Sequence, residues 1–391
     1  MFAVFANPRK LFLWIVMGIA AIGLASCQGV SIPGDGASLD ARAPVPVALL
    51  VPRGAADPNE QKLARDLENA ARMAASDLGG VRVDLRIYAT AGNAAKAREA
   101  ALAAASDGAR IIIGPLRAEA ARIAADAVAS RGINVLAFSN NPTIAGGNLF
   151  ILGQTFHDTA NRLTNFATAQ GRDRLLTVFA DTASGRLGRE AISQAITRTG
   201  AVPAGSVSHA LSQEAVIDAV PRVKQLAEEN AANAIFFTAT TAGALPLFTQ
   251  ILPEAGLGQD KAQYIGLTRW DTPPQTLDLP GVQGGWFALP DPGRTARFEA
   301  RFEAAFGNPP HALSGLAYDG IAAVGALVKQ GGRGALSRAA LTQPAGFQGV
   351  NGIFRFTPEG TNERGLAVAT IEDRKVQVIS HAPTRFAGAG F

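Results

Sequence analysis

Cysteine, histidine, tryptophan and tyrosine are all scarce in this sequence. Its 391 residues include one cysteine, three tryptophans, three tyrosines and four histidines. With a single cysteine the chain cannot form an internal disulfide, so a folded domain must be held together by its apolar core. The four histidines are scattered, and none has a metal-ligand partner at helical spacing. They are His157, His209, His311 and His381.

Catalytic motifs and strong charge are also missing. There is no Gly-x-Ser-x-Gly turn, no Ser-x-x-Lys pair and no phosphate-binding loop. We therefore expect no catalytic residue, no metal and no cofactor, and predict that the protein is not an enzyme. The formal net charge is +4, and it is +2 without the two basic residues Arg9 and Lys10. So small a charge argues against a nucleic-acid partner.

The first residues predict secretion. Arg9 and Lys10 are followed by an uncharged apolar run from Leu11 to about Ala25. A basic start and an apolar segment of this kind are typical of a secretory signal peptide, and the run is short for a membrane-spanning helix. We predict that residues 1–26 are a signal peptide. Residues 27–43 are rich in Gly, Ser, Pro and Asp, which indicates a flexible tether.

The apolar run ends at Leu24-Ala25-Ser26-Cys27. This segment resembles the lipobox of bacterial lipoproteins, in which the cysteine is lipidated and becomes the first residue of the mature chain. The resemblance implies a lipid anchor on Cys27. Because Gln28 rather than Asp follows the cysteine, it also implies sorting to the periplasmic side of the outer membrane. Two alternatives stay open: a plain signal peptide with a chance cysteine, and an uncleaved anchor helix.

From residue 44 onward, strand patterns alternate with helical ones. Residues 45–51 are a continuous apolar strand, residues 59–78 have apolar positions at helical spacing, and residues 111–113 are a short buried strand. A second alternation of this kind starts after Leu152. The pattern predicts an α/β protein of two lobes, each a parallel sheet flanked by helices, joined by hinge crossovers. The predicted bounds are 44–152 plus 290–345 for lobe 1 and 153–289 plus 346–385 for lobe 2.

Four local sequences resemble the type I periplasmic-binding-protein fold of the branched-chain amino-acid receptors. They are residues 111–116 (IIIGPL), 135–140 (VLAFSN), 318–320 (YDG) and 349–356 (GVNGIFRF). In that order they are similar to the third strand and its loop, the fourth strand and its loop, the start of a late helix of lobe 1 and the closing β-hairpin. The resemblance covers nearly the whole mature chain. It implies a ligand cleft beyond the carboxyl ends of the strands.

Residues at the expected strand ends are the candidates for that cleft. They are Arg53, Leu116, Arg117, Ala118, Ser139, Asn140, Thr240, Thr268 and Trp270. In the amino-acid receptors, hydroxyls and backbone N–H groups after the third strand hold the ligand carboxylate. Here that loop reads Arg117-Ala118-Glu119, with no hydroxyl and with a Glu that would repel an anion, which argues against a free amino acid. Arg117 either replaces the lost donors by a bidentate contact or lies in solvent or between the lobes. Trp270 either lines the cleft or packs in the core.

A subgroup of the same superfamily, the penicillin-binding protein activators, offers a further resemblance. It rests on Cys27, Gln28, the Ile-Gly-Pro-Leu loop and the stretch 264–271 (YIGLTRWD). These lipoproteins contact and stimulate peptidoglycan synthases. Their long-known members carry a large helical-repeat domain before this one, and residues 28–44 leave no room for it.

Two functions therefore stay open. The first is a lipid-anchored regulator that activates a peptidoglycan synthase by protein–protein contact. The alternative is a solute receptor that binds an amino acid or a related small molecule between its lobes, for a transporter or sensor. The missing hydroxyls and the expected outer-membrane anchor favour the first. The polar residues kept at the cleft favour the second. We predict the activator role and keep the receptor as the alternative.

Overall fold

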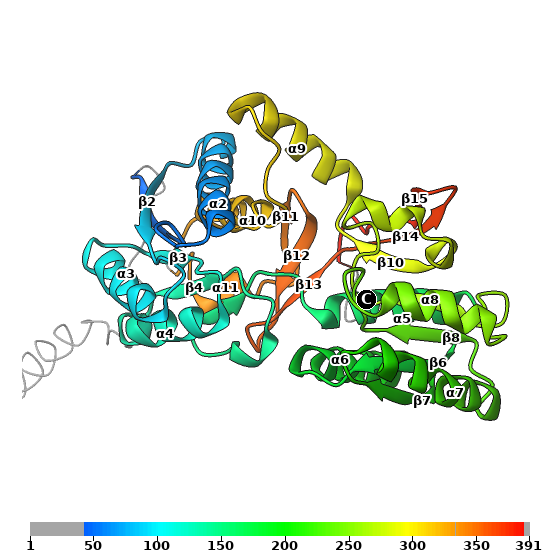
Figure 1. The fold of residues 1–391 in the computed structure, drawn as a ribbon. Coiled ribbons are helices and arrows are strands. Elements are labelled where there is room, and N and C mark those ends of the chain that lie inside the picture. Colours follow the sequence, from blue (N-terminus) through cyan, green and yellow to red (C-terminus); the bar gives the residue numbers. More distant parts are fainter. Residues whose placement is uncertain (1–42, 333, 387–391) are drawn as a thin grey trace, which may run out of the picture.

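The computed structural model describes residues 43–332 and 334–386, and these form two lobes joined by a central region (Figure 1). The predicted signal peptide, Cys27 and the tether up to residue 42 lie outside the described residues. Among the described residues, no helix is both long enough and apolar enough to cross a membrane.

The first lobe is built on a five-stranded parallel sheet in the order β2-β1-β3-β4-β5. Its strands are β1 (Val45–Val51), β2 (Val83–Ala89), β3 (Ile111–Ile113), β4 (Asn134–Ala137) and β5 (Leu149–Ile151). Helices α2 (Pro58–Asp77), α3 (Ala94–Ser106) and α4 (Ala118–Val128) connect the strands, and α10 (Gly315–Gln330) and α11 (Arg338–Leu341) return to this lobe. Because helices cover both faces, β1 and β3 are buried along almost their whole length, as their continuous apolar sequences predict.

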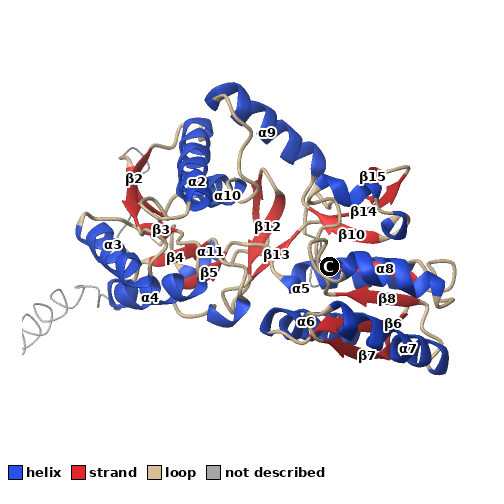
Figure 2. Cartoon of the chain, viewed as in Figure 1, coloured by secondary structure: helices blue, strands red, loops and turns tan. Residues whose placement is uncertain are grey.

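The second lobe contains a seven-stranded sheet in the order β15-β14-β10-β9-β8-β6-β7. Its strands are β6 (Arg174–Ala180), β7 (Val202–His209), β8 (Ala234–Phe237), β9 (Gln263–Gly266), β10 (Trp286–Leu289), β14 (Ala367–Glu372) and β15 (Lys375–Ser380). Five strands are parallel. At one edge β14 pairs antiparallel with β10, and β15 pairs antiparallel with β14. The helices are α5 (Phe156–Ala169), α6 (Ala183–Thr199), α7 (Gln213–Glu229) and α8 (Leu245–Glu254), and Figure 2 shows them beside the strands they connect.

A third, antiparallel sheet lies between the lobes (Figure 1). It consists of β11 (Phe347–Gly349), β12 (Gly352–Phe356) and β13 (Asn362–Arg364). The sequence assigns residues 346–385 as a whole to lobe 2. In the structure this segment is divided, because Phe347, Phe354 and Phe356 join the core of the first lobe while β14 and β15 belong to the second sheet. Aromatic residues on alternate positions predict a strand, but they do not indicate which core receives them.

Within residues 43–386 the described chain crosses between the lobes three times. The crossovers are the link from β5 to α5, the link from β10 to α9 (Pro292–Phe306), and the link from β13 to β14. Helix α9 returns to the first lobe, where Phe298 and Phe302 enter its core. The three links lie next to one another in the middle of the molecule, at the carboxyl end of β5, and they position the site described next.

Candidate ligand-binding site

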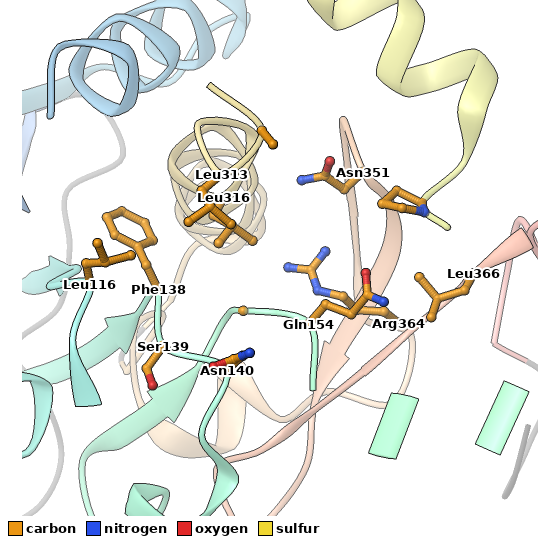
Figure 3. Close-up of a pocket in the computed structure, with 13 residues that line it drawn as sticks. Leu116, Phe138, Ser139, Asn140, Gln154, Leu313, Leu316, Asn351, Arg364 and Leu366 are labelled. Atoms are coloured by element: carbon orange, nitrogen blue, oxygen red, sulfur yellow. The ribbon is translucent and has the colours of Figure 1, made fainter. Parts of the chain in front are cut away.

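A cavity of about 250 Å³ lies where the first lobe meets the three crossovers. Its lining residues come from the loops after β3 and β4, from the start of α10, from the turn between β11 and β12, and from the crossovers (Figure 3). They are Leu116, Phe138, Ser139, Asn140, Gly153, Gln154, Pro290, Ala312, Leu313, Leu316, Asn351, Arg364 and Leu366. Ligands of open parallel sheets bind at this position, beyond the carboxyl ends of the strands.

The cavity has an apolar side and a polar side. Leu116, Phe138, Leu313 and Leu316 lie together on the side of the first lobe (Figure 3). Gln154, Asn351 and Arg364 face them from the crossovers and the central sheet. An apolar wall with a few convergent polar groups is the usual composition of a small-molecule site.

Arg364 is the one charged residue of the cavity lining, and its charge is compensated. Its guanidinium is 3.1 Å from Asp319 Oδ2, and the two side chains are 2% and 0% exposed. Asp319 also accepts hydrogen bonds from the backbone N–H of Val350 at 2.8 Å and from Asn351 Nδ2 at 3.2 Å. Burial raises the pKa of Asp319 above its ordinary value, while Arg364 and the other donors act in the opposite direction. The pair joins α10 of the first lobe to β13.

A second set of hydrogen bonds fixes the crossover between β5 and α5. Asn362 Nδ2 donates to the carbonyl oxygens of Ile151 at 2.7 Å and Gly153 at 2.8 Å. Asp158 accepts from the backbone N–H and the hydroxyl of Thr155, which caps α5, and from the backbone N–H of Arg364. Burial raises the pKa of Asp158 to about 6. The polar side of the cavity therefore rests on a buried network that connects both lobes.

The structure brings together only part of the residues expected at the cleft. Leu116, Ser139 and Asn140 line the cavity. Arg53 and Arg117 do not, because each forms an ion pair on the first lobe, with Glu68 and Glu60 respectively. Neither possibility left open for Arg117 included this contact: its side chain is 60% exposed and is paired with Glu60 within the first lobe. Ala118 is the first residue of α4 and does not line the cavity either.

The candidates from the second lobe lie outside this cavity. Thr240 is exposed, and Thr268 donates a hydrogen bond of 3.4 Å to the carbonyl oxygen of Ala239. Their loops follow β8 and β9, on the second lobe's side of the crossovers. That Thr240 and Thr268 contact a ligand once the lobes approach each other stays a prediction.

Of the two environments left open for Trp270, the structure shows the core, and Trp270 does not line the cavity. It is fully buried in the second lobe together with Phe287 and Tyr264. Two glycines make room for it: a Cβ added at Gly266 would lie 2.1 Å from Trp270 Nε1, and one added at Gly285 would lie 2.0 Å from its Cζ3. A tryptophan just after a strand can lie either in the cleft or in the core. Here the space left by Gly266 and Gly285 admits its indole to the core.

Gly285→Ala is expected to lower the free energy of unfolding by about 2–3 kcal/mol, the cost of overpacking a core. Gly285 does not need a left-handed backbone, so the added methyl group and its clash with Trp270 cause the loss. Urea unfolding measures it. Gly79→Ala is the control, since nothing lies within 4 Å of a Cβ at Gly79. Equal stability of Gly285→Ala and the parent chain would contradict this packing.

The sequence did not indicate the polar residues of the cavity beyond Ser139 and Asn140. Gln154, Asn351 and Arg364 are separated by up to 210 residues from one another, and no motif includes them together. Among the described residues there is no group of three or more His, Cys, Asp or Glu that could hold a metal ion.

Comparison with known proteins agrees with this architecture. A family model described as periplasmic binding protein matches residues 44–375. Solved structures with a similar fold include a protein from Rhodospirillum rubrum assigned as a branched-chain amino acid ABC transporter, with 19% identity over 86% of this chain and 100% of that one and a TM-score of 0.73. No curated protein matches the chain.

Two similar structures carry ligands. A substrate-binding protein of an ABC transporter from Desulfitobacterium hafniense, in complex with Leu, has 17% identity over 86% of this chain and 100% of that one and a TM-score of 0.62. A solute-binding protein from Rhodopseudomonas palustris BisB5, in complex with 3,4-dihydroxybenzoic acid, has 17% identity over 88% of this chain and 97% of that one and a TM-score of 0.58. At these identities the likeness shows the fold alone. Since the family model spans most of the sequence and the two lobes agree with it, the chain belongs to the periplasmic binding protein family.

Proposed function

We propose that this protein is the receptor for a small organic solute, which it holds between its lobes and delivers to an ABC transporter. The observation that carries the proposal is the cavity at the crossovers, with an apolar side from the first lobe and a polar side from the central sheet. The family and the solved structures that contain Leu or 3,4-dihydroxybenzoic acid support it. The solute is small, because a cavity of about 250 Å³ lies just below the usual range of ligand sites.

Binding proceeds by closure of the two lobes about the three crossovers. The solute first contacts the first lobe, whose loops after β3 and β4 form one wall of the cavity. The loops after β8 and β9, which contain Thr240 and Thr268, then cover it from the second lobe. The buried pair of Asp319 and Arg364 and the bonds of Asn362 keep the polar side in place during this movement.

The family is periplasmic, which agrees with the predicted signal peptide. We further propose that Cys27 is lipidated and that the tether of residues 27–43 holds the receptor near a membrane. Because Gln28 and not Asp follows the cysteine, that membrane is the outer one. A receptor that serves a transporter of the inner membrane would then reach it across the periplasm, or the anchor lies in the inner membrane. Metabolic labelling with a palmitate analogue, lost in Cys27→Ser, tests the anchor.

The comparisons favour the receptor over activation of a peptidoglycan synthase, which no family match supports. The two functions differ in their partner, and one experiment separates them. Receptor function requires a small molecule that stabilises the protein on its own. Activator function requires a protein partner and no small molecule.

A thermal-shift screen of the full chain in detergent is therefore expected to give a clear hit among amino acids, small amides, organic acids and aromatic acids. A ligand at one hundred times its dissociation constant stabilises the folded state by about 2.7 kcal/mol, which raises the melting temperature by several degrees. Absence of any shift, together with capture of a peptidoglycan synthase by the immobilised chain, would contradict the receptor and support the activator.

A further inference from the structure

The cavity contains no uncompensated charge. Of its thirteen lining residues, eight are apolar, and four have uncharged polar side chains. Those four are Ser139, Asn140, Gln154 and Asn351. The remaining residue, Arg364, is neutralised by Asp319 and also donates to the carbonyl oxygen of Leu152. A ligand that brings a net charge, or two separated charges, into this space finds no free counter-charge, and burying an unpaired charge is costly.

The loop after β3 does not supply the missing positive charge. Arg117 is paired with Glu60 and lines no part of the cavity. Glu119 occupies the first turn of α4, where it opposes the binding of an anion at that helix terminus. A ligand carboxylate is therefore served neither by the arginine of this loop nor by a hydroxyl, since residues 116–118 are Leu, Arg and Ala.

The carboxylates in the facing loops of the second lobe do not supply a free negative charge either. Asp181 lies 2.6 Å from Arg186, and Asp271 lies 2.6 Å from Arg269. Arg269 binds Asp271 through two nitrogens, which fixes the pair. An α-ammonium group entering from this side would meet carboxylates whose charge is already compensated by an arginine.

What the polar side offers to a ligand is hydrogen-bond acceptors, because Arg364 Nε, which has no hydrogen-bond partner, is buried away from solvent. Gln154 uses its Nε2 to donate to Thr159 Oγ1 at 3.0 Å, and Asn351 uses its Nδ2 to donate to Asp319. Both side chains therefore have an amide oxygen left for a ligand. Figure 3 shows these two residues on the same side of the cavity, opposite Leu116, Leu313, Leu316 and Phe138.

We propose that the solute is an uncharged amphiphile: a small molecule with an apolar body and a polar end that donates N–H or O–H groups, such as a primary amide or an alcohol. The apolar body lies against Leu116, Leu313 and Leu316, and the donors face Gln154 and Asn351. The inference rests on the proposed receptor function and names its ligand class. It distinguishes this chain from the relatives whose structures hold Leu or 3,4-dihydroxybenzoic acid.

Four compounds with one carbon skeleton test the charge preference: 4-methylpentanamide, 4-methylpentanoate, leucine and 4-methylpentan-1-amine. We expect the amide to bind the full chain at least about tenfold more tightly than each of the other three at pH 7, as measured by calorimetric titration. Equal or tighter binding of the carboxylate, the amino acid or the amine overturns the inference.

Gln154→Glu adds a direct control, because it places one negative charge in the cavity. The variant is expected to bind the amine at least about tenfold more tightly than the parent chain does and to bind the amide more weakly. Gln225→Glu, at an exposed position of α7, should leave all four affinities unchanged. An unaltered amine affinity in a folded Gln154→Glu variant counts against the inference.

Failure of the inference and failure of the receptor function give different results. If a charged compound binds best and the amide does not, the receptor function stands and the ligand class proposed here is wrong. If neither these compounds nor any member of the screening set binds, both proposals fail.

Discussion

Replacing Asp319 by Ala is expected to lower the free energy of unfolding by about 3–5 kcal/mol, the range observed when one partner of a buried ion pair is removed. Asp319 and Arg364 are fully enclosed, so the variant leaves a guanidinium in the protein interior without its paired carboxylate. It also removes the acceptor for Val350 N–H and Asn351 Nδ2. Denaturant unfolding followed by circular dichroism measures the loss.

Two variants make the reason for this loss testable. Asp126→Ala removes a carboxylate from an exposed pair with Arg122 on α4 and should change the stability by less than about 0.5 kcal/mol. Asp319→Leu combined with Arg364→Met removes both charges and should recover a large part of the stability lost by Asp319→Ala. A double variant as unstable as the single one would show that the charge left unpaired is not the cause.

Below neutral pH, the stability of the protein relative to Asp158→Asn is expected to fall as the pH rises from about 4 to about 6. Burial raises the pKa of Asp158 from its ordinary value of 3.8 to about 6. Below pH 4 the Asp158 carboxyl is protonated in the folded and the unfolded chain alike, and its full contribution to the free energy of unfolding is present. Between these pH values only the unfolded chain loses the proton, so folding becomes less favourable by about 3 kcal/mol in total, and above pH 6 the difference is constant.

The measurement is the free energy of unfolding at several pH values for the parent chain and for Asp158→Asn. The difference between the two curves isolates Asp158, because all other carboxyl groups are common to both. Asp126→Asn serves as the control at an exposed site and should give a difference curve without this step. A difference curve that rises with pH would mean that hydrogen bonds from Thr155 and Arg364 outweigh burial and lower the pKa of Asp158.

The fold could be predicted from the sequence because its signals are local. The continuous apolar strands β1 and β3 and the alanine-rich helices α3 and α4 each fit one period, and their alternation specifies a parallel sheet. The strand at residues 352–356 and its hairpin were predicted. Their place in a separate central sheet was not, because it requires knowledge of which core receives Phe347, Phe354 and Phe356. That choice depends on contacts with α10, which lies earlier in the chain and returns to the first lobe.

The candidate site could be predicted only at the strand ends. Leu116, Ser139 and Asn140 follow β3 and β4 directly, so the topology alone brings them to one edge of the sheet. Arg364 and Asn351 reach the cavity through the central sheet, and their place depends on the buried pair of Arg364 with Asp319. Arg117 was expected near the ligand because its charge suits a carboxylate. Its partner Glu60, on a helix 57 residues earlier, could not be identified from spacing.

The central claim is that a solute binds in the cavity at the crossovers, and a titration of Ala312→Trp tests it most directly. Ala312 lines the cavity and is exposed, so an indole there fills the space without disturbing the core. We predict that the solute found in the thermal-shift screen binds the parent chain at one site and binds Ala312→Trp at least a hundredfold more weakly, a change of about 2.7 kcal/mol. Ala305→Trp, at an exposed position of α9, should bind as the parent chain does. Unchanged affinity in Ala312→Trp would mean that the solute binds elsewhere and would contradict the account.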